Sequence, residues 1–239
     1  MANTPAKPPT TPDDAFLREV DEEYRRSQMV GLWQRYGKWA IAALVLALGA
    51  LAFWLYWQDR QEKAAGDAGA ALTRAMEQME VGEGARARPV LEAMTRDGPG
   101  AYAGLARMVL ANDALAGGDK AKARGLYEAV ANDSTLPPPL RDAALIKAVR
   151  VGFDQLPPGE VVSRLKPLAV PGNAWFGVAG ELVAVAHFKA GKPELAKPIL
   201  IALVKDDKLS PSLRSRAAQL AIAAGVDVAA LGLDAQPAQ

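Results

Sequence analysis

Few side chains in this chain could carry out chemistry. Its 239 residues include one histidine, His187, and no cysteine. Without cysteine there is no thiol nucleophile and no thiolate metal site, and one histidine cannot build a histidine-rich metal centre. Ser212 and Ser215 lack a neighbouring base, and the carboxylates show no paired spacing. The sequence therefore predicts no catalytic, cofactor-binding or metal-binding residues, and a protein that is not an enzyme.

Two arginines are the remaining candidates for ligand recognition. Arg141 and Arg214 occupy equivalent positions in an internal repeat that is described below. Each would either hold a carboxylate of a partner, or cover a helix end or pair locally. Gly82-x-Gly84 is not expected to bind phosphate, because it follows a predicted helix and not a strand. His187 lies on an apolar helix, where packing is its expected role.

The composition indicates what kind of elements position these side chains. Alanine makes up 48 of the 239 residues, whereas aromatic residues make up 6%. Alanine is the best helix former, and its small side chain lets helix axes approach closely. Hydrophobic residues make up 50% of the chain, which is enough for a core. Because the net charge is only +1, no basic field attracts nucleic acid. We expect an all-α protein that does not bind nucleic acid.

An uncharged segment, Trp39–Gln58, predicts a membrane-spanning helix. Its 20 residues lie between Lys38 and Asp59, and aromatic residues mark both ends. At about 1.5 Å per residue, such a helix matches the roughly 30 Å hydrocarbon thickness of a bilayer. A cleaved signal sequence would be shorter and would precede small residues, whereas Trp57-Gln58-Asp59-Arg60 ends this segment. The segment is thus expected to anchor the protein in a membrane, within bounds of 36–58.

Basic residues on the two sides of the anchor indicate its orientation. Four precede it within fifteen residues and two follow it within the same distance, namely Arg25, Arg26, Arg35 and Lys38 against Arg60 and Lys63. Since segments rich in Lys and Arg stay in the cytoplasm, residues 1–35 are expected to form a cytoplasmic tail. In a bacterium the C-terminal part then lies in the periplasm, and the protein crosses the inner membrane once.

The cytoplasmic tail has two predicted parts. Residues 1–12 contain four prolines and few apolar side chains, so they are expected to be disordered. Residues 13–26 place apolar side chains at helical spacing, which predicts a short amphipathic helix. This helix would either dock a cytosolic partner or rest on the lipid headgroups.

Beyond the anchor the chain repeats itself. Shifting residues 101–144 by 73 positions onto 174–217, without a gap, gives 13 identities in 44 positions. Each block divides at a glycine, Gly118 or Gly191, into two predicted amphipathic helices. Counting back 36 residues from Gly118 leads to Gly82, which separates an earlier pair of helices. The pattern predicts four helical hairpins spaced by about 36 residues.

The spacing within a hairpin is that of tetratricopeptide repeats. A small turn residue is followed after five residues by alanine and then by larger apolar residues, as in Gly118, Ala123 and Tyr127. The third hairpin lacks this glycine and alanine, and Pro157-Pro158 predicts an irregular turn there. Gly66 and Gly69 are expected to weaken or break the first helix.

The predicted fold is therefore all-α, with a single N-terminal transmembrane helix followed by a tetratricopeptide-like α-solenoid. The solenoid is expected over residues 59–225, with about four helical hairpins and a capping helix at about 211–224. A C-terminal tail follows at 226–239.

The predicted working surface lies on the first helix of each hairpin, which lines the concave face of such arrays. The turn glycines set the register, and the residues expected to point inward and bind partners are Met76, Met79, Met108, Asn112, Leu115, Ile146, Arg150, Phe153, Glu181, Val185 and Phe188. Flexible methionine side chains repack against many shapes, which suits varied unfolded segments. Alternatively, several of these residues fill the space under the closing helix.

Motifs around the anchor resemble those of a known family. An acidic-then-basic stretch, Glu19-Val20-Asp21-Glu22-Glu23-Tyr24-Arg25, precedes Trp33-x-x-Tyr36-Gly37-Lys38, and Trp54-x-Tyr56-Trp57-Gln58 leaves the membrane. Leu140-Arg141-Asp142-Ala143-Ala144 and Asn173-Ala174-Trp175 fit as well. Over roughly residues 15–225 the chain resembles the bacterial YfgM family.

The resemblance implies an ancillary subunit of the SecYEG translocon with a tetratricopeptide-like periplasmic domain. Its implied partners are the translocon, a membrane-anchored periplasmic prolyl-isomerase-like chaperone, and unfolded secreted proteins as they emerge. A second hypothesis is an envelope scaffold that organises outer-membrane or cell-wall assembly without the translocon, because the same anchor and repeats would serve it.

Overall fold

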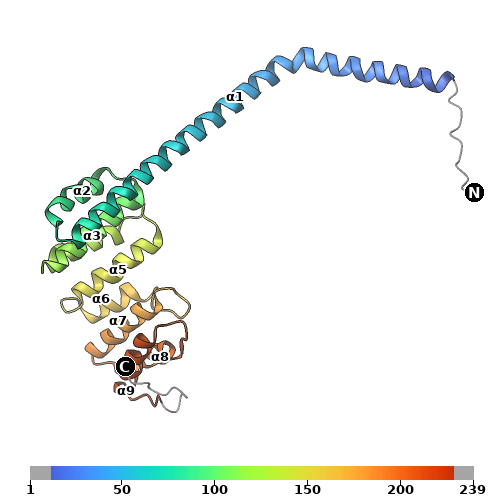
Figure 1. Cartoon of the computed structure of the whole chain (residues 1–239). Coiled ribbons are helices and arrows are strands. Elements are labelled where there is room, and N and C mark those ends of the chain that lie inside the picture. The colour runs from blue at the N-terminus through green and yellow to red at the C-terminus, as the bar shows by residue number, and fades with distance from the viewer. Residues whose placement is uncertain (1–11, 229–239) are drawn as a thin grey trace, which may run out of the picture. The chain divides into compact units, whose positions relative to one another are not determined.

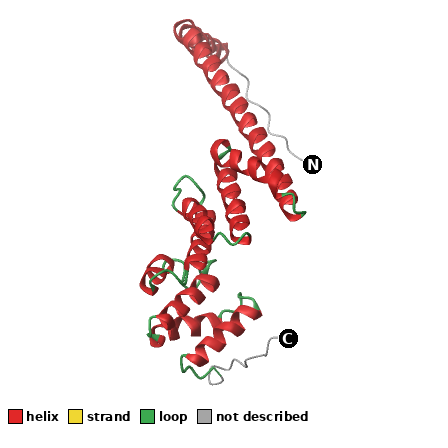
Figure 2. Cartoon of the chain, turned by 90° about the vertical axis from the view of Figure 1, so that its left-hand side faces the viewer, coloured by secondary structure: helices red, strands yellow, loops and turns green. Residues whose placement is uncertain are grey.

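The computed structural model describes residues 12–228, and all regular structure among them is α-helical (Figures 1 and 2). Its helices are α1 (Pro12–Glu80), α2 (Gly84–Asp97), α3 (Gly100–Ala116), α4 (Lys120–Ala131), α5 (Pro138–Gly152), α6 (Pro158–Leu165), α7 (Phe176–Lys189), α8 (Pro193–Lys205) and α9 (Pro211–Ala223). The chain forms two compact units, which divide after Lys63. The expectations for residues 1–11 and 229–239 lie outside the described residues.

The first helix is longer than the sequence predicts. Separate helices are expected over 13–26 and 36–58, whereas α1 is continuous over 69 residues. No proline follows Pro12 until Pro89, and a glycine inside a helix costs only about 1 kcal/mol relative to alanine. The break predicted at Gly66 and Gly69 is therefore wrong. A Cβ atom on Gly69 would lie 3.2 Å from the Tyr102 hydroxyl oxygen, so glycine lets α3 approach α1 there.

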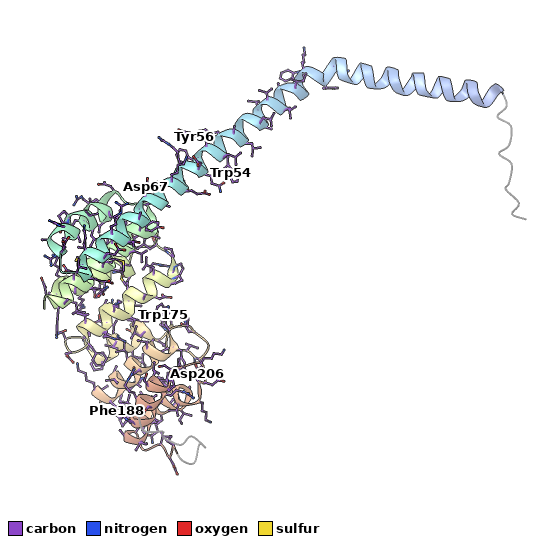
Figure 3. The ribbon with its side chains drawn as sticks, viewed as in Figure 1. Trp54, Tyr56, Asp67, Trp175, Phe188 and Asp206 are labelled. Carbon is purple, nitrogen blue, oxygen red and sulfur yellow. The ribbon has the colours of Figure 1, made fainter. Side chains whose placement is uncertain are left out.

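Between Trp39 and Trp57, exposed apolar side chains surround α1 on all sides. The stretch Arg35–Glu80 is long and apolar enough to contain a membrane span. Its most apolar window has a mean hydropathy of 2.1, and none of that window is buried. Trp54 and Tyr56 stand out from the helix with 59% and 58% of their surface exposed (Figure 3). Such continuous apolar exposure is unfavourable in water and suits a lipid environment.

The C-terminal unit contains four apolar cores in sequence. The first is built by α1, α2 and α3, and the second by α3, α4 and α5. The third is built by α5, α6 and α7, and the last by α7, α8 and α9. The helices α3, α5 and α7 therefore each contribute to two cores. Such nearest-neighbour packing is the defining property of a solenoid, so the predicted fold class is confirmed.

The turns follow the predicted register. Gly82, Gly118 and Gly191 have φ angles of 82°, 84° and 68°, a left-handed conformation that favours glycine. The alanines five residues after these glycines are completely buried, which lets the two helices of a hairpin pack closely. Gly225 ends α9 in the same way, with φ of 80°, a turn that the repeat comparison does not predict.

The third hairpin is the irregular one, as the sequence predicts. A five-residue connection, 153–157, joins α5 to α6, and Pro157 and Pro158 begin the second helix. Proline is favoured at this position because its fixed φ suits the first turn and its missing N–H would be unpaired there. The helix α6 has only eight residues, and α5 packs more extensively on α4 than on α6.

Candidate interaction surface

The eleven residues predicted to line one face do not all lie on the surface. Met108 and Ile146 are only 8% and 4% exposed and belong to apolar cores, which corrects their assignment. Because α3 and α5 each serve two cores, the buried arc of each helix is wider than the repeat register assumes. Met76 and Leu115 are 43% and 37% exposed. Of the others, Asn112 and Arg150 are exposed, and Met79, Phe153, Glu181, Val185 and Phe188 are partly buried.

A polar contact ties α3 to α5 on this face. The hydroxyl of the buried Tyr127 donates to Asn112 Oδ1 at 2.5 Å, and Lys147 Nζ donates to the same oxygen at 3.2 Å. The ammonium group of Lys147 also lies 5.6 Å from the centre of the Tyr127 ring, within range of a cation–π attraction. Burial raises the pKa of the Tyr127 phenol, so the hydroxyl stays protonated and continues to donate at neutral pH.

Equivalent contacts tie α5 to α7 and α7 to α9. Lys189 Nζ donates to the carbonyl oxygens of Phe153 and Asp154 at 3.1 and 2.9 Å, just beyond the end of α5. Arg216 binds both carboxylate oxygens of Glu181, at 2.7 and 2.9 Å. The contacts made by Lys147 with Asn112, by Lys189 and by Arg216 join residues 35 or 36 positions apart, which is one repeat.

Sequence reasoning missed the residues that supply these ties, namely Lys147, Lys189 and Arg216. The signal that would have found them is the presence of polar side chains one repeat apart in the sequence.

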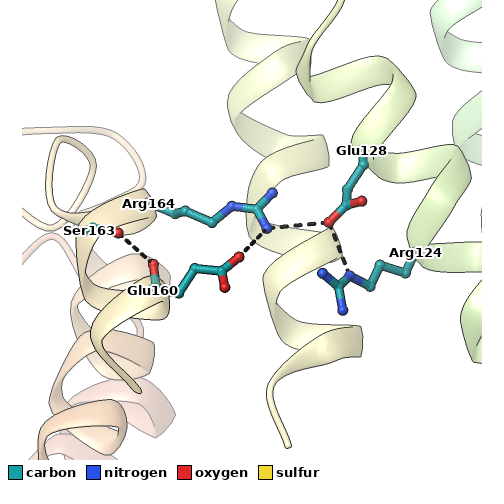
Figure 4. Close-up of polar contacts among 5 residues, drawn as sticks. All are labelled: Arg124, Glu128, Glu160, Ser163 and Arg164. Atoms are coloured by element: carbon teal, nitrogen blue, oxygen red, sulfur yellow. Dashed lines mark hydrogen bonds and ion pairs between the residues drawn. The ribbon is translucent and has the colours of Figure 1, made fainter. Parts of the chain in front are cut away.

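A separate acidic–basic network joins the second helices of the middle hairpins (Figure 4). Glu128 Oε1 accepts from Arg124 at 3.0 Å and from Arg164 at 3.3 Å, and Arg164 lies 3.5 Å from Glu160. Partial burial acts to raise the pKa of the Glu128 carboxyl, but the two guanidinium groups outweigh this and hold it below its usual value. The positive and negative charges of this network largely compensate each other.

Three cations on the predicted face are not compensated in this way. Lys147, Arg150 and Lys189 form no ion pair with any carboxylate in the part of the chain whose side chains are described. Arg150 follows Lys147 by three residues, so both side chains project from the same side of α5. By contrast, the guanidinium of Arg88 forms an ion pair with Asp113 and lowers the pKa of that carboxyl. The face thus carries exposed positive charge beside apolar side chains.

The remaining candidate residues behave differently from one another. Burial, together with the charge of Lys192, lowers the pKa of His187, so this side chain is neutral at neutral pH. Arg141 and Arg214 each have a buried Nε atom without a hydrogen-bond partner among the described residues. Neither forms an ion pair there, so local pairing does not account for them. Among the side chains that the structure describes, which begin at residue 35, no group of three or more His, Asp or Glu is arranged to hold a metal ion.

Comparison with known proteins adds a family-level match. A family model described as a tetratricopeptide repeat-like domain matches residues 31–197, which run from before the apolar segment of α1 into α8. No curated protein and no solved structure matches the chain.

Proposed function

The chain belongs to the tetratricopeptide repeat-like domain family, and from this premise we propose that it is a membrane-anchored, chaperone-like scaffold that assists secreted proteins. Repeat solenoids of this kind serve as surfaces for protein–protein interaction. The resemblance of the anchor motifs to the YfgM family supports the SecYEG translocon and a periplasmic prolyl-isomerase-like chaperone as partners. The proposed location is the bacterial inner membrane, with the solenoid in the periplasm.

One observation carries this proposal. A single chain joins an apolar helix that is exposed on all sides to a solenoid whose first helices expose apolar and uncompensated basic side chains. The first feature holds the protein at a membrane, and the second presents a surface that recognises other polypeptides. An anchored binding surface is what a helper needs if it meets proteins as they emerge from a membrane pore.

Purification of the tagged full chain in mild detergent tests the proposal. Translocon subunits are expected to co-purify with the full chain and to be lost from a matched control that contains residues 1–63 alone. Recovery of outer-membrane or cell-wall assembly proteins in place of the translocon would favour the envelope scaffold and would contradict the proposal.

The proposed topology makes a separate prediction. A reporter enzyme that is active only outside the cytoplasm is expected to work when it is fused after residue 225, and to fail when it is fused near residue 10. The reason is the excess of basic residues before the anchor, four against two. The opposite pattern of activity would overturn both the orientation and the periplasmic location.

A further inference from the structure

We propose that the start of the membrane span binds the headgroup of an anionic phospholipid through two basic side chains, Arg35 and Lys38, which form the basic pair. The ligand is a lipid whose headgroup carries a phosphate and no amine, as in phosphatidylglycerol. This lipid belongs to the anchor, whereas the proposed function concerns protein partners of the solenoid. The lipid site relies only on α1 as a membrane anchor.

The sequence before the span carries an unbalanced positive charge. Residues 24–38 contain four basic residues and no aspartate or glutamate. The fifteen residues that follow the uncharged segment, 59–73, contain two basic and three acidic residues. One end of the anchor thus has a formal charge of +4 and the other of −1. An anionic headgroup is attracted to the first end and repelled from the second.

The two members of the basic pair can reach the same headgroup. Arg35 and Lys38 are three residues apart on α1, so their side chains project from the same side of the helix. Both side chains are exposed. The pair can therefore contact the oxygens of one phosphate, which the guanidinium binds through two parallel hydrogen bonds and the ammonium group attracts as a point charge.

The acidic residues of α1 lie far from the basic pair. The nearest in sequence are Glu23, twelve residues before Arg35, and Asp59, 21 residues after Lys38. Since α1 is continuous, these separations correspond to about 18 Å and about 31 Å along the helix. Among the side chains that the structure describes, neither Arg35 nor Lys38 forms an ion pair. Their charges are left for a ligand from outside the chain.

Aromatic neighbours place the basic pair at the depth of the lipid headgroups. Tyr36 and Trp39 are 54% and 69% exposed, and the uncharged segment begins at Trp39. Tyr and Trp side chains prefer the headgroup level of a bilayer. The Arg35 guanidinium lies 5.8 Å from the centre of the Tyr36 ring. A cation–π contact holds the face of a guanidinium and leaves the N–H groups in its plane to bind phosphate.

The opposite end of the span has a similar arginine in different surroundings. The Arg60 guanidinium also lies 5.8 Å from the centre of a tyrosine ring, that of Tyr56. The neighbouring cation Lys63 is held by Asp59 at 2.6 Å, and the local formal charge is negative. Arg60 therefore makes the same contact with tyrosine without the surplus of positive charge, which makes it a matched reference for Arg35.

Native mass spectrometry of the full chain in detergent micelles tests the proposal. The probes are phosphatidylglycerol and phosphatidylcholine with identical acyl chains, which share the phosphate and differ in the positive charge of choline. The unaltered chain is expected to bind phosphatidylglycerol at least about fivefold more tightly, since each Lys or Arg near an anionic lipid raises the affinity roughly fivefold.

The double variant Arg35→Gln, Lys38→Gln is expected to weaken phosphatidylglycerol binding by at least about fivefold, with a smaller effect on phosphatidylcholine. The exchange Arg35→Lys, Lys38→Arg keeps both charges and should keep the preference for phosphatidylglycerol. Arg60→Gln is the matched control and should keep it too. Circular dichroism should show equal helicity in all variants, because the replaced side chains are exposed.

Equal affinities of the unaltered chain for the two lipids, or an equal loss in the double variant and in Arg60→Gln, would contradict the proposal. Displacement of phosphatidylglycerol by an equal concentration of free glycerol phosphate would show a general anion site and would contradict it too. The proposed function is tested separately. If translocon subunits co-purify with a chain that shows no lipid preference, the lipid site is wrong and the scaffold proposal stands; the opposite pair of results would overturn the scaffold and keep the lipid site.

Discussion

Removing residues 1–58 is expected to turn the membrane-bound protein into a soluble one that keeps its helices. The solenoid unit begins at Ala64 and has its own four cores, whereas the apolar segment of α1 is exposed on all sides. Residues 59–239 should therefore appear in the soluble fraction after cell lysis and show a strongly helical circular dichroism spectrum. The full chain should sediment with membranes and require detergent.

A point variant provides the control for this deletion. Leu48→Arg places a charge near the middle of the segment, where it costs about 2.5–3.5 kcal/mol of insertion free energy, and should release part of the full chain from the membrane. Leu48→Ala should leave the protein membrane-bound. Sedimentation of residues 59–239 with membranes would show that the solenoid itself binds lipid, and would contradict the assignment of α1 as the anchor.

Truncating either of two buried side chains at equivalent repeat positions is expected to destabilise the solenoid strongly. Tyr127 and Leu200 are 73 residues apart, and both are completely buried. Tyr127→Ala should lower the free energy of unfolding by about 3–5 kcal/mol and Leu200→Ala by about 2–5 kcal/mol, because each leaves a cavity in a packed core. Urea denaturation of residues 59–239, followed by circular dichroism, measures both changes.

Leu195→Ala is the control for this pair, because Leu195 lies on α8 with 52% of its surface exposed. Its effect should stay within about 0.5 kcal/mol. If Tyr127→Ala or Leu200→Ala unfolds at the same urea concentration as the unaltered domain, the repeat register and the cores built on it are incorrect.

The hairpins could be predicted from sequence because their turns need particular residues. A left-handed turn requires glycine at positions such as Gly118 and Gly191, and close packing requires alanine five residues later. These local requirements recur at one spacing, so they reveal the helices, their order and their buried faces. The irregular turn of the third hairpin could be predicted as well, because Pro157 and Pro158 restrict the backbone on their own.

The exposed residues of the predicted face were harder to predict, because the burial of each side chain there depends on neighbours far away in the sequence. Met108 has the same apolar character as the exposed Met76, and only the second core that α3 helps to build explains its burial. The positions of Lys147 and Lys189 on this face follow from contacts with residues one repeat away in the sequence. A local sequence pattern holds no information about such contacts. The place of Gly69 on α1 likewise has a reason only in the folded protein, where Tyr102 of α3 packs beside it.

The sharing of α3, α5 and α7 between adjacent cores determines where the molecule can be shortened or joined to another protein. A chain that stops after α5 or α7 keeps all three helices of each earlier core, and exposes only the face of its last helix that served the next core. A chain that stops after α4 or α6 leaves its last core open on one side and exposes apolar residues to water. Permissible breakpoints therefore alternate along the sequence, and engineered versions of different lengths should be built in steps of two helices.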